Sequence, residues 1–204
     1  MNGRSESTRT RSRDVEGALV DAAEAVLVRE GAAALTVRAV ATEAGVAPMG
    51  VYNRFGSKDG LLDALLVRGF RRFEATLRSN PEVLPLPRLR ACGQQYRTFA
   101  LANPRFYELM FQYAGSLDAH SQELDAAGGA AFGVLVENVV AAQAAGGIRP
   151  GDPAELAQLI WSAVHGAMSL ELAGRTLTPD PEASYENLLE LIVEGLQTRP
   201  AEHG

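Results

Sequence analysis

The sequence predicts an all-α protein of about nine helices, with a small N-terminal helical unit, a long connecting helix and a larger helical domain. Three observations lead to this prediction. Apolar residues recur at helical spacing along most of the 204 residues, Gly and Pro separate these stretches, and no segment alternates as a strand does. Hydrophobic residues make up 47% of the chain and charged residues 22%, as is usual for a protein with a full core.

Two helices are predicted before residue 45. The first covers Asp14 to Glu30, where apolar residues recur at helical spacing between charged ones. Gly31 then ends it, as a C-terminal glycine does. The second helix is short, follows an N-cap at Thr36 and ends at Gly45.

A third helix begins at Pro48, where a missing N–H costs nothing, and runs to about Asn53. Because a glycine at position 45 permits a sharp turn, the second and third helices are predicted to form a helix-turn-helix. Such a unit can place the N-terminal residues of its second helix against base edges in a DNA major groove. We expect its core to contain Ala41, Val46 and Val51.

The remaining helices follow from similar signals. Ser57 is a suitable N-cap for a long helix, and three prolines in residues 80–87 predict a link to the larger domain. Beyond the link we predict helices over residues 88–102, 104–113, 122–145, 153–172 and 184–197. The chain thus divides into a flexible arm (1–13), a helix-turn-helix domain (14–60), a connecting helix (61–80), a larger helical domain (81–199) and a tail (200–204).

The net charge of −6 argues against a nucleic-acid binder until its distribution is considered. Residues 1–60 contain eight basic and eight acidic side chains, so all of the excess acid lies beyond residue 60. The arm carries four arginines and one glutamate. A basic arm of this kind can contact a DNA backbone or minor groove, although it can equally be a solvated tail.

Residues 14–66 resemble the DNA-binding domain of the TetR family of one-component transcriptional regulators. The sequence departs from the family at Ala39, Ala47 and Met49, where an acidic residue, Ser and Gly are common. The missing Ser hydroxyl weakens the N-cap of the third helix by about 1 kcal/mol. The resemblance rests on Thr36-Val37-Arg38, Ala41, Ala44-Gly45-Val46, Val51-Tyr52, Phe55, Ser57-Lys58-Asp59 and Leu61-Leu62.

The resemblance implies a homodimeric repressor that binds a palindromic operator in double-stranded DNA and is released by a small ligand. Two alternatives stay open. One is a regulator of the same fold that needs no small-molecule inducer or acts as an activator. The other is a helical binding protein whose helix-turn-helix is vestigial.

The same resemblance implies which residues contact DNA. The Tyr52 hydroxyl, the Lys58 ammonium and Thr36 would meet phosphates. Asn53 can pair with adenine, while Met49 and Pro48 offer apolar contact to thymine methyl groups. Arg54 and the arm residues Arg9, Arg11 and Arg13 would add phosphate or minor-groove contacts, or else be merely solvated. The full set of predicted DNA-binding residues is Thr36, Arg38, Pro48, Met49, Gly50, Tyr52, Asn53 and Lys58.

The larger domain is expected to dimerise and to bind a ligand, because C-terminal domains of this family usually do both. Trp161 and His165-Gly166 resemble its Trp-His-Gly subtype. An uncharged helix over 156–170 and an apolar final helix predict a homodimer through the last two helices, unless both complete the monomer core. An apolar pocket for a small apolar or aromatic effector is predicted, although such residues are also typical of a core: Tyr96, Phe99, Tyr107, Phe111, Phe132, Trp161 and His165.

Other classes of function find no support in the sequence. The single cysteine, Cys92, excludes an internal disulfide and a thiolate metal cluster. We find no phosphate-binding loop, nucleophile elbow or paired metal ligands, so we predict no catalytic residue, metal or cofactor, and no enzyme. With no signal peptide, and no uncharged stretch longer than Leu156–Leu170, we expect a cytoplasmic protein without a membrane partner.

Overall fold

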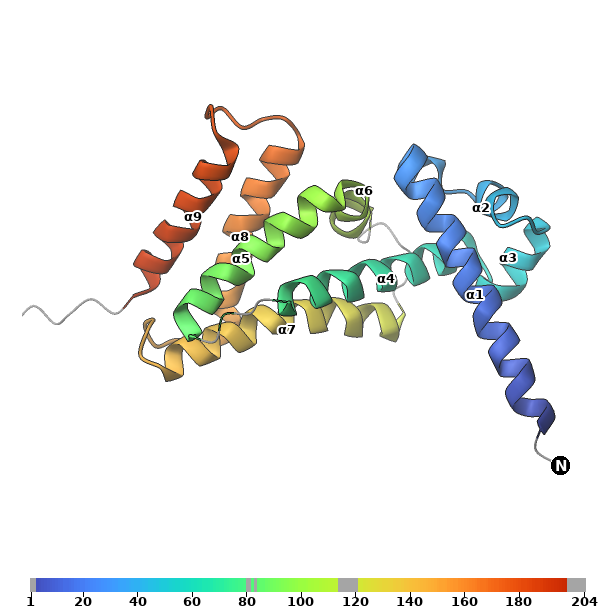
Figure 1. Ribbon diagram of the computed structural model, residues 1–204, viewed down its shortest axis with the longest axis horizontal. Helices are drawn as coiled ribbons and strands as arrows, with labels where there is room; N and C mark the ends of the chain where they lie inside the picture. The colour runs from blue at the N-terminus through green and yellow to red at the C-terminus, as the bar shows by residue number, and fades with distance from the viewer. Residues whose placement is uncertain (1–2, 80–81, 83, 114–120, 198–204) are drawn as a thin grey trace, which may run out of the picture. The chain divides into compact units, whose positions relative to one another are not determined.

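The computed structural model describes residues 3–79, 82, 84–113 and 121–197. In this part of the chain it contains nine α-helices and no strand, so the predicted all-α class is confirmed (Figure 1). The predicted tail lies outside the described residues, and so do the side chains of the arginines in the arm.

The order of the helices agrees with the predicted order. A short 3-10 helix, η1 (Ala32–Ala34), follows the first helix, and a π-helical stretch, η2 (Leu109–Tyr113), continues the sixth. The α-helices are α1 (Gly3–Glu30), α2 (Val37–Glu43), α3 (Pro48–Phe55), α4 (Lys58–Arg78), α5 (Pro85–Ala102), α6 (Pro104–Glu108), α7 (Gln122–Ala144), α8 (Pro153–Leu172) and α9 (Pro181–Leu196).

Three helices begin earlier than predicted. Helix α1 starts at Gly3, before its first apolar residues, because helical spacing of apolar residues cannot reveal a polar helical extension. Helix α5 starts at Pro85, inside the predicted link, since a proline in the first turn loses no hydrogen bond. Helix α9 starts at Pro181, and the carboxylate of its N-cap, Asp180, accepts a bond from the amide of Ala183 at 3.0 Å.

The chain divides into two compact units, which we describe separately. The first unit consists of residues 1–70 and 105–126, and the second of residues 71–104 and 127–204. Helices α4 and α7 therefore contribute residues to both. The domain limits deduced from the sequence remain predictions.

The first unit contains α1, α2, α3 and α6, together with most of α4 and the start of α7. Its core buries apolar side chains of α1, α2 and α4, among them Val26, Val40 and Leu65. The start of α7 is attached to α4, because Asp63 accepts bonds from the Ser121 amide at 3.0 Å and the Ser121 hydroxyl at 2.6 Å. The same hydroxyl accepts from the amide of Leu124 and so caps α7.

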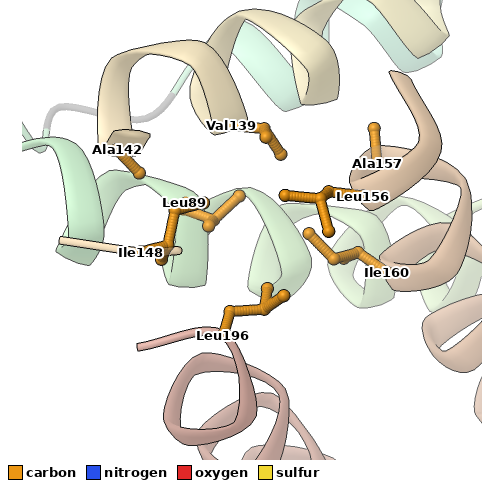
Figure 2. Close-up of a cluster of buried hydrophobic side chains, with 8 residues drawn as sticks. All are labelled: Leu89, Val139, Ala142, Ile148, Leu156, Ala157, Ile160 and Leu196. Atoms are coloured by element: carbon orange, nitrogen blue, oxygen red, sulfur yellow. The ribbon is translucent and has the colours of Figure 1, made fainter. Parts of the chain in front are cut away.

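The second unit packs α5, α7, α8 and α9 around an aliphatic cluster, in which each buried Leu, Ile or Val side chain contributes about 1.5–3 kcal/mol. Polar pairs at its edge attach α5 to α8 and α9, since Arg97 pairs with Glu171 at 2.7 Å and Arg90 with Glu186 at 2.6 Å. Figure 2 shows how the cluster converges from four helices and the loop after α7: Leu89, Val139, Ala142, Ile148, Leu156, Ala157, Ile160 and Leu196.

Helix α7 has the length and apolar composition of a membrane span. Core helices of soluble proteins share these properties, so the feature is weak support for a membrane location. Its buried residues include Val134, Val139 and Ala142.

Candidate nucleic-acid interface

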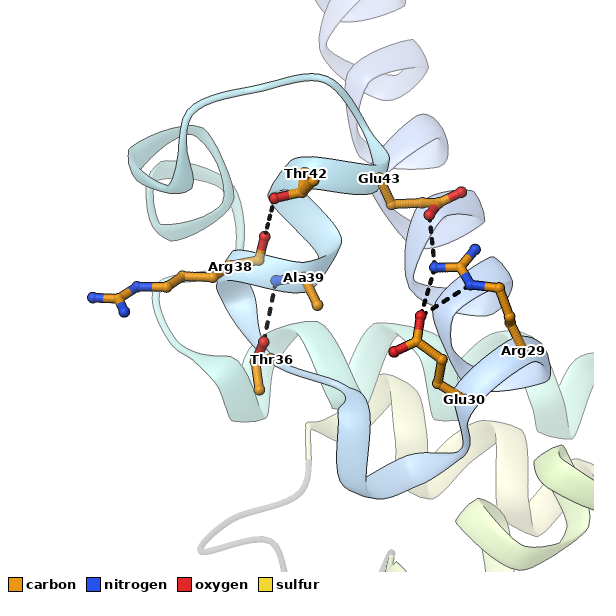
Figure 3. A network of polar contacts seen from close by, with 7 residues as sticks. All are labelled: Arg29, Glu30, Thr36, Arg38, Ala39, Thr42 and Glu43. Atoms are coloured by element: carbon orange, nitrogen blue, oxygen red, sulfur yellow. Dashed lines mark hydrogen bonds and ion pairs between the residues drawn. The ribbon is translucent and has the colours of Figure 1, made fainter.

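Helices α2 and α3 form the predicted helix-turn-helix. Thr36 is the N-cap of α2, and its hydroxyl accepts a bond from the amide of Ala39 at 3.1 Å (Figure 3). Gly45 adopts φ +67°, a left-handed conformation that favours glycine, and so allows the turn between the two helices. The amide of Val46 then donates to the carbonyl oxygen of Ala41 at 2.9 Å, which ties the turn to α2.

The core of this unit differs from the prediction at one residue. Ala41 and Val51 are buried, as expected, but the side chain of Val46 is 40% exposed. Val46 lies beside Gly50, where a Cβ would stand 3.8 Å from its Cγ2 atom. Because glycine has no side chain to cover its neighbour, Val46 stays partly in solvent.

Helix α3 presents an uncharged surface to solvent. Val51 is fully buried, and at about 100° per residue Met49 and Asn53 both lie on the opposite side of the helix. The Met49 side chain is 64% exposed and that of Tyr52 is 47% exposed. All five of the residues of α3 predicted to contact DNA are exposed: Pro48, Met49, Gly50, Tyr52 and Asn53.

The two ends of α3 are formed in different ways. Ala47 is its N-cap and makes no side-chain capping bond, so the expected loss of a cap hydroxyl is confirmed, and Pro48 begins the helix. At the other end Gly56 adopts φ +73° and donates its amide to the carbonyl oxygen of Tyr52 at 2.8 Å. The sharp turn that follows leads directly into α4.

Helix α4 begins at Lys58, whose side chain is exposed. The hydroxyl of Ser57 accepts the amide of Gly60 at 3.0 Å and caps the helix, as predicted. The first turn of a helix carries free N–H groups and a positive dipole end, both of which favour a phosphate. Lys58 thus adds an exposed positive charge to an end of α4 that already favours anions.

The two arginines of the helix-turn-helix have different surroundings. Arg54 does not project into solvent, because its Nε atom donates to the Glu16 carboxylate at 2.9 Å and its Nη2 atom bonds the same oxygen. This pair joins α3 to α1, and we did not expect it from the sequence. Arg38 is exposed and extends away from α2 (Figure 3). Across the same region, Arg29 of α1 pairs with Glu43 of α2 at 2.9 Å.

The predicted pocket residues are divided between the two units. Tyr107 and Phe111 belong to the first unit, where their ring centroids lie 4.8 Å apart and Phe111 also contacts Phe70 at 6.1 Å. The other five belong to the second unit: Tyr96, Phe99, Phe132, Trp161 and His165.

In the second unit the aromatic residues form a continuous row. Trp161 lies between Phe132 and His165, with ring centroids 6.1 Å and 5.7 Å away. His165 Nδ1 lies 2.9 Å from the Tyr96 hydroxyl, within hydrogen-bonding distance. Tyr96 continues the row to Phe73, at 5.3 Å. Phe73 of α4 is buried and was not among the residues predicted to line a pocket.

The environment of these groups gives no sign of catalysis or metal binding. Among the residues that the structure describes, no three His, Cys, Asp or Glu side chains are placed to hold a metal ion. Burial raises the pKa of Cys92 to about 11, so its thiol is protonated at neutral pH and a poor nucleophile. Burial lowers the pKa of His165 below its usual 6.5.

Two sequence profiles of one family match the chain. A profile described as "Bacterial regulatory proteins, tetR family" matches residues 19–65, and one described as "Tetracyclin repressor-like, C-terminal domain" matches residues 89–192. The chain belongs to the TetR family. It is therefore a TetR-type transcriptional regulator, and the family as a whole binds DNA, forms dimers and is generally not enzymatic.

Individual relatives align along almost the whole chain. The HTH-type transcriptional regulators Rv1816 of Mycobacterium tuberculosis and Mb1846 of Mycobacterium bovis are each 26% identical over 224 residues, covering 93% of both chains. A protein of unknown function from Rhodococcus sp. RHA1 is 29% identical with a TM-score of 0.80, covering 90% of this chain and 96% of that one.

The fold is shared more widely than the sequence. A bacterial regulatory protein of the TetR family from Rhodococcus RHA1 has a TM-score of 0.68 at 20% identity, covering 91% of this chain and 98% of its own. At this identity the likeness supports the TetR fold alone.

Removing the cap of α2 is expected to destabilise this TetR-type domain. Thr36→Ala deletes the oxygen that accepts the Ala39 amide, so the free energy of unfolding should fall by about 1 kcal/mol in urea denaturation. Thr36→Ser keeps the hydroxyl and should retain most of the stability. Equal stability of the alanine variant and the wild type would contradict the capping role.

The lowered pKa of His165 predicts a pH-dependent stability. Above about pH 6.5 this histidine is neutral in both the folded and the unfolded chain, so it does not make the free energy of unfolding depend on pH. Below that pH the unfolded chain binds the proton first, and the free energy of unfolding falls until the pH reaches the lower pKa of the folded state. Between pH 7.5 and 5, the free energy of unfolding from urea denaturation should fall less for His165→Gln than for the wild type. Parallel plots of this free energy against pH for the two proteins would contradict the role of His165.

Proposed function

We propose that this TetR-family regulator is a cytoplasmic homodimer that binds a palindromic operator as a repressor and is released by a small, largely apolar ligand. The observation that carries the DNA-binding part is the surface of α3. Its predicted base-facing residues are all exposed around a buried Val51, and Tyr52 and Lys58 stand exposed beside them. Hydroxyl and ammonium groups of this kind bond phosphates, while the α3 residues meet base edges.

The test is duplex binding by the full-length protein. We expect binding to the promoter region beside its own gene, with an affinity that falls as the salt concentration rises, because phosphate contacts release counterions. A shuffled duplex of the same length and composition serves as the control. Absent or salt-insensitive binding to promoter DNA would overturn the proposal and favour a helical binding protein with a vestigial helix-turn-helix.

The dimer part of the proposal is supported by the outer surface of α8 and α9. Some of the apolar residues of these helices complete the monomer core, including Leu189 and Leu196. Others stay exposed, and Leu191 of α9 is 66% exposed. On α8, Gly166 is exposed with nothing within 4 Å of a built Cβ, so a second helix can approach its backbone closely. A two-fold pair of α8 and α9 would cover these residues in a four-helix interface.

Sedimentation velocity can test this interface. Leu191→Glu places a charge on the proposed contact surface and should shift the protein from dimer toward monomer. Leu177→Glu is a matched control, because Leu177 is 98% exposed and lies between the two helices. A dimer that is equally stable in both variants would contradict the use of α9.

The ligand part is supported by the aromatic row in the second unit, where His165 and Tyr96 supply polar groups beside Trp161 and Phe132. The presence of Trp161 and His165-Gly166 in α8 also supports the Trp-His-Gly subtype. We propose that ligand binding shifts α4, the helix that supplies residues to both units. This shift would change the distance between the two α3 helices of the dimer, which are the helices that enter the DNA grooves. DNA and ligand should then weaken each other's binding by the same factor, whereas independent binding would refute induction but not DNA binding.

A further inference from the structure

The basic side chains of the helix-turn-helix limit what α3 can recognise. Residues 36–55 contain two basic side chains, Arg38 on α2 and Arg54 on α3. Arg54 directs both its Nε and its Nη2 atoms to the carboxylate of Glu16. The recognition helix therefore meets DNA with its single guanidinium already engaged within the protein.

The exposed face of α3 carries a different chemistry. Met49 and Asn53 are one helical turn apart and lie on the same side, opposite the buried Val51. Met49 has a flexible apolar side chain that is exposed to solvent. The side-chain amide of Asn53 has a carbonyl oxygen that accepts hydrogen bonds and an NH2 group that donates two. Two side chains one turn apart on one helix face can reach neighbouring base pairs of a major groove.

The bases differ in the hydrogen-bonding and apolar groups that they present in the major groove. In the major groove guanine presents two acceptors, N7 and O6, which an arginine or lysine fork meets best. Adenine presents an acceptor at N7 and a donor at N6, which match the amide of an asparagine. Thymine adds a methyl group, which an apolar side chain covers. The exposed face of α3 has the partners for adenine and thymine but not the cation for guanine.

We propose that α3 reads A·T base pairs, with Asn53 bonding an adenine edge and Met49 covering a thymine methyl group. The proposal rests on the DNA-binding function proposed above and names the class of operator that this function requires. The other guanidinium of the helix-turn-helix, that of Arg38, extends from α2 rather than from α3 (Figure 3).

Selection from a randomised DNA pool tests the proposal and assumes no operator sequence. The full-length protein is used to enrich duplexes from the pool, and the enriched sequences are compared with those selected by Met49→Ala and Asn53→Ala. The positions whose preference changes in these variants are the steps that α3 reads. We expect A·T pairs at those steps for the wild type, and Val28→Ala, which truncates an exposed residue of α1, should select the same sequences as the wild type.

Modified bases then test each contact atom by atom. Replacing the thymine by deoxyuridine removes only the methyl group, which should weaken the wild type about fourfold and leave Met49→Ala unchanged. Replacing the adenine by 7-deazaadenine removes the N7 acceptor, which should weaken the wild type at least about fivefold and leave Asn53→Ala unchanged. Circular dichroism of each variant confirms that it is folded.

The outcomes separate the inference from the proposed function. Enrichment of duplexes with G·C pairs at the steps read by α3, or base substitutions that affect wild type and variants equally, would overturn the A·T inference while DNA binding stands. If Arg54→Ala changes a guanine preference at these steps, Arg54 leaves Glu16 on binding and the inference fails. If no duplex is enriched at all, the proposed function fails together with the inference.

Discussion

Gly60→Ala is expected to lower the free energy of unfolding by about 3 kcal/mol, the upper part of the usual range for overpacking. A Cβ built at Gly60 would stand 2.1 Å from the carbonyl oxygen of Phe55, far inside van der Waals contact. The atom it meets belongs to the backbone, so no side-chain rotation can relieve the clash. The turn at Gly56 and the first turn of α4 would have to separate, as urea denaturation should show.

A second glycine provides the control for this substitution. Gly128 lies inside α7, and nothing stands within 4 Å of a Cβ built there. Gly128→Ala should therefore gain up to about 1 kcal/mol from the higher helix propensity of alanine. Opposite signs at the two positions would establish the close approach at Gly60, and a gain at both would rule it out.

The same junction positions the proposed phosphate-binding groups, so Gly60→Ala should also weaken operator binding. Tyr52 lies in the last turn of α3 and Lys58 in the first turn of α4, on the two sides of the turn that the clash would open. The affinity of the folded fraction should fall, because the hydroxyl and the ammonium would no longer have their native spacing. Binding measured well below the unfolding midpoint distinguishes this effect from loss of folded protein.

Tyr52→Phe is expected to weaken operator binding about tenfold for each half-site, the value of one hydrogen bond to a charged group. The side chain is 47% exposed, and no described residue bonds its hydroxyl, so deleting the oxygen should leave stability unchanged. A dimer would use the residue twice, which gives a loss of about a hundredfold if the two half-sites act independently. Fluorescence titration of the operator duplex measures it.

Two further variants make this result specific. Lys58→Ala should also weaken binding and, because it removes a cation, should reduce the slope of log affinity against log salt by about 1 for each half-site, which Tyr52→Phe should not do. Tyr185→Phe removes a buried hydroxyl that donates to the Gly93 carbonyl at 2.9 Å. It should cost about 1 kcal/mol of stability and no DNA affinity. Wild-type binding by Tyr52→Phe would remove the tyrosine from the interface.

Several local features could be predicted because neighbouring residues in the chain encode them. Thr36 caps α2 through an amide three residues away, and the left-handed turn at Gly45 depends on the glycine itself. Exposure of Met49 and Asn53 follows from their helical spacing relative to Val51. Their position on one face of α3 could be predicted, because they are four residues apart in a helix.

Other features could not be predicted, because they join residues that are distant in the chain. Arg54 lies in the last turn of α3 and by residue type was available for DNA, yet its partner is Glu16, 38 residues earlier. This pairing has no signal in local spacing or residue propensity. The exposure of Val46 was missed for a different reason, because its residue type suits a helix-turn-helix core while Gly50, four residues later, has no side chain to cover it.

The amino-acid sequence by itself determined the helices, the helix-turn-helix and the family, because capping, glycine conformation and helical periodicity act over three or four residues. Only the tertiary structure decided which charges and rings are engaged. It paired Arg54 with Glu16 across 38 positions and brought His165 to Tyr96 across 69 positions. The physical reason is that these contacts depend on how helices pack, and packing selects partners by shape and distance rather than by position in the chain.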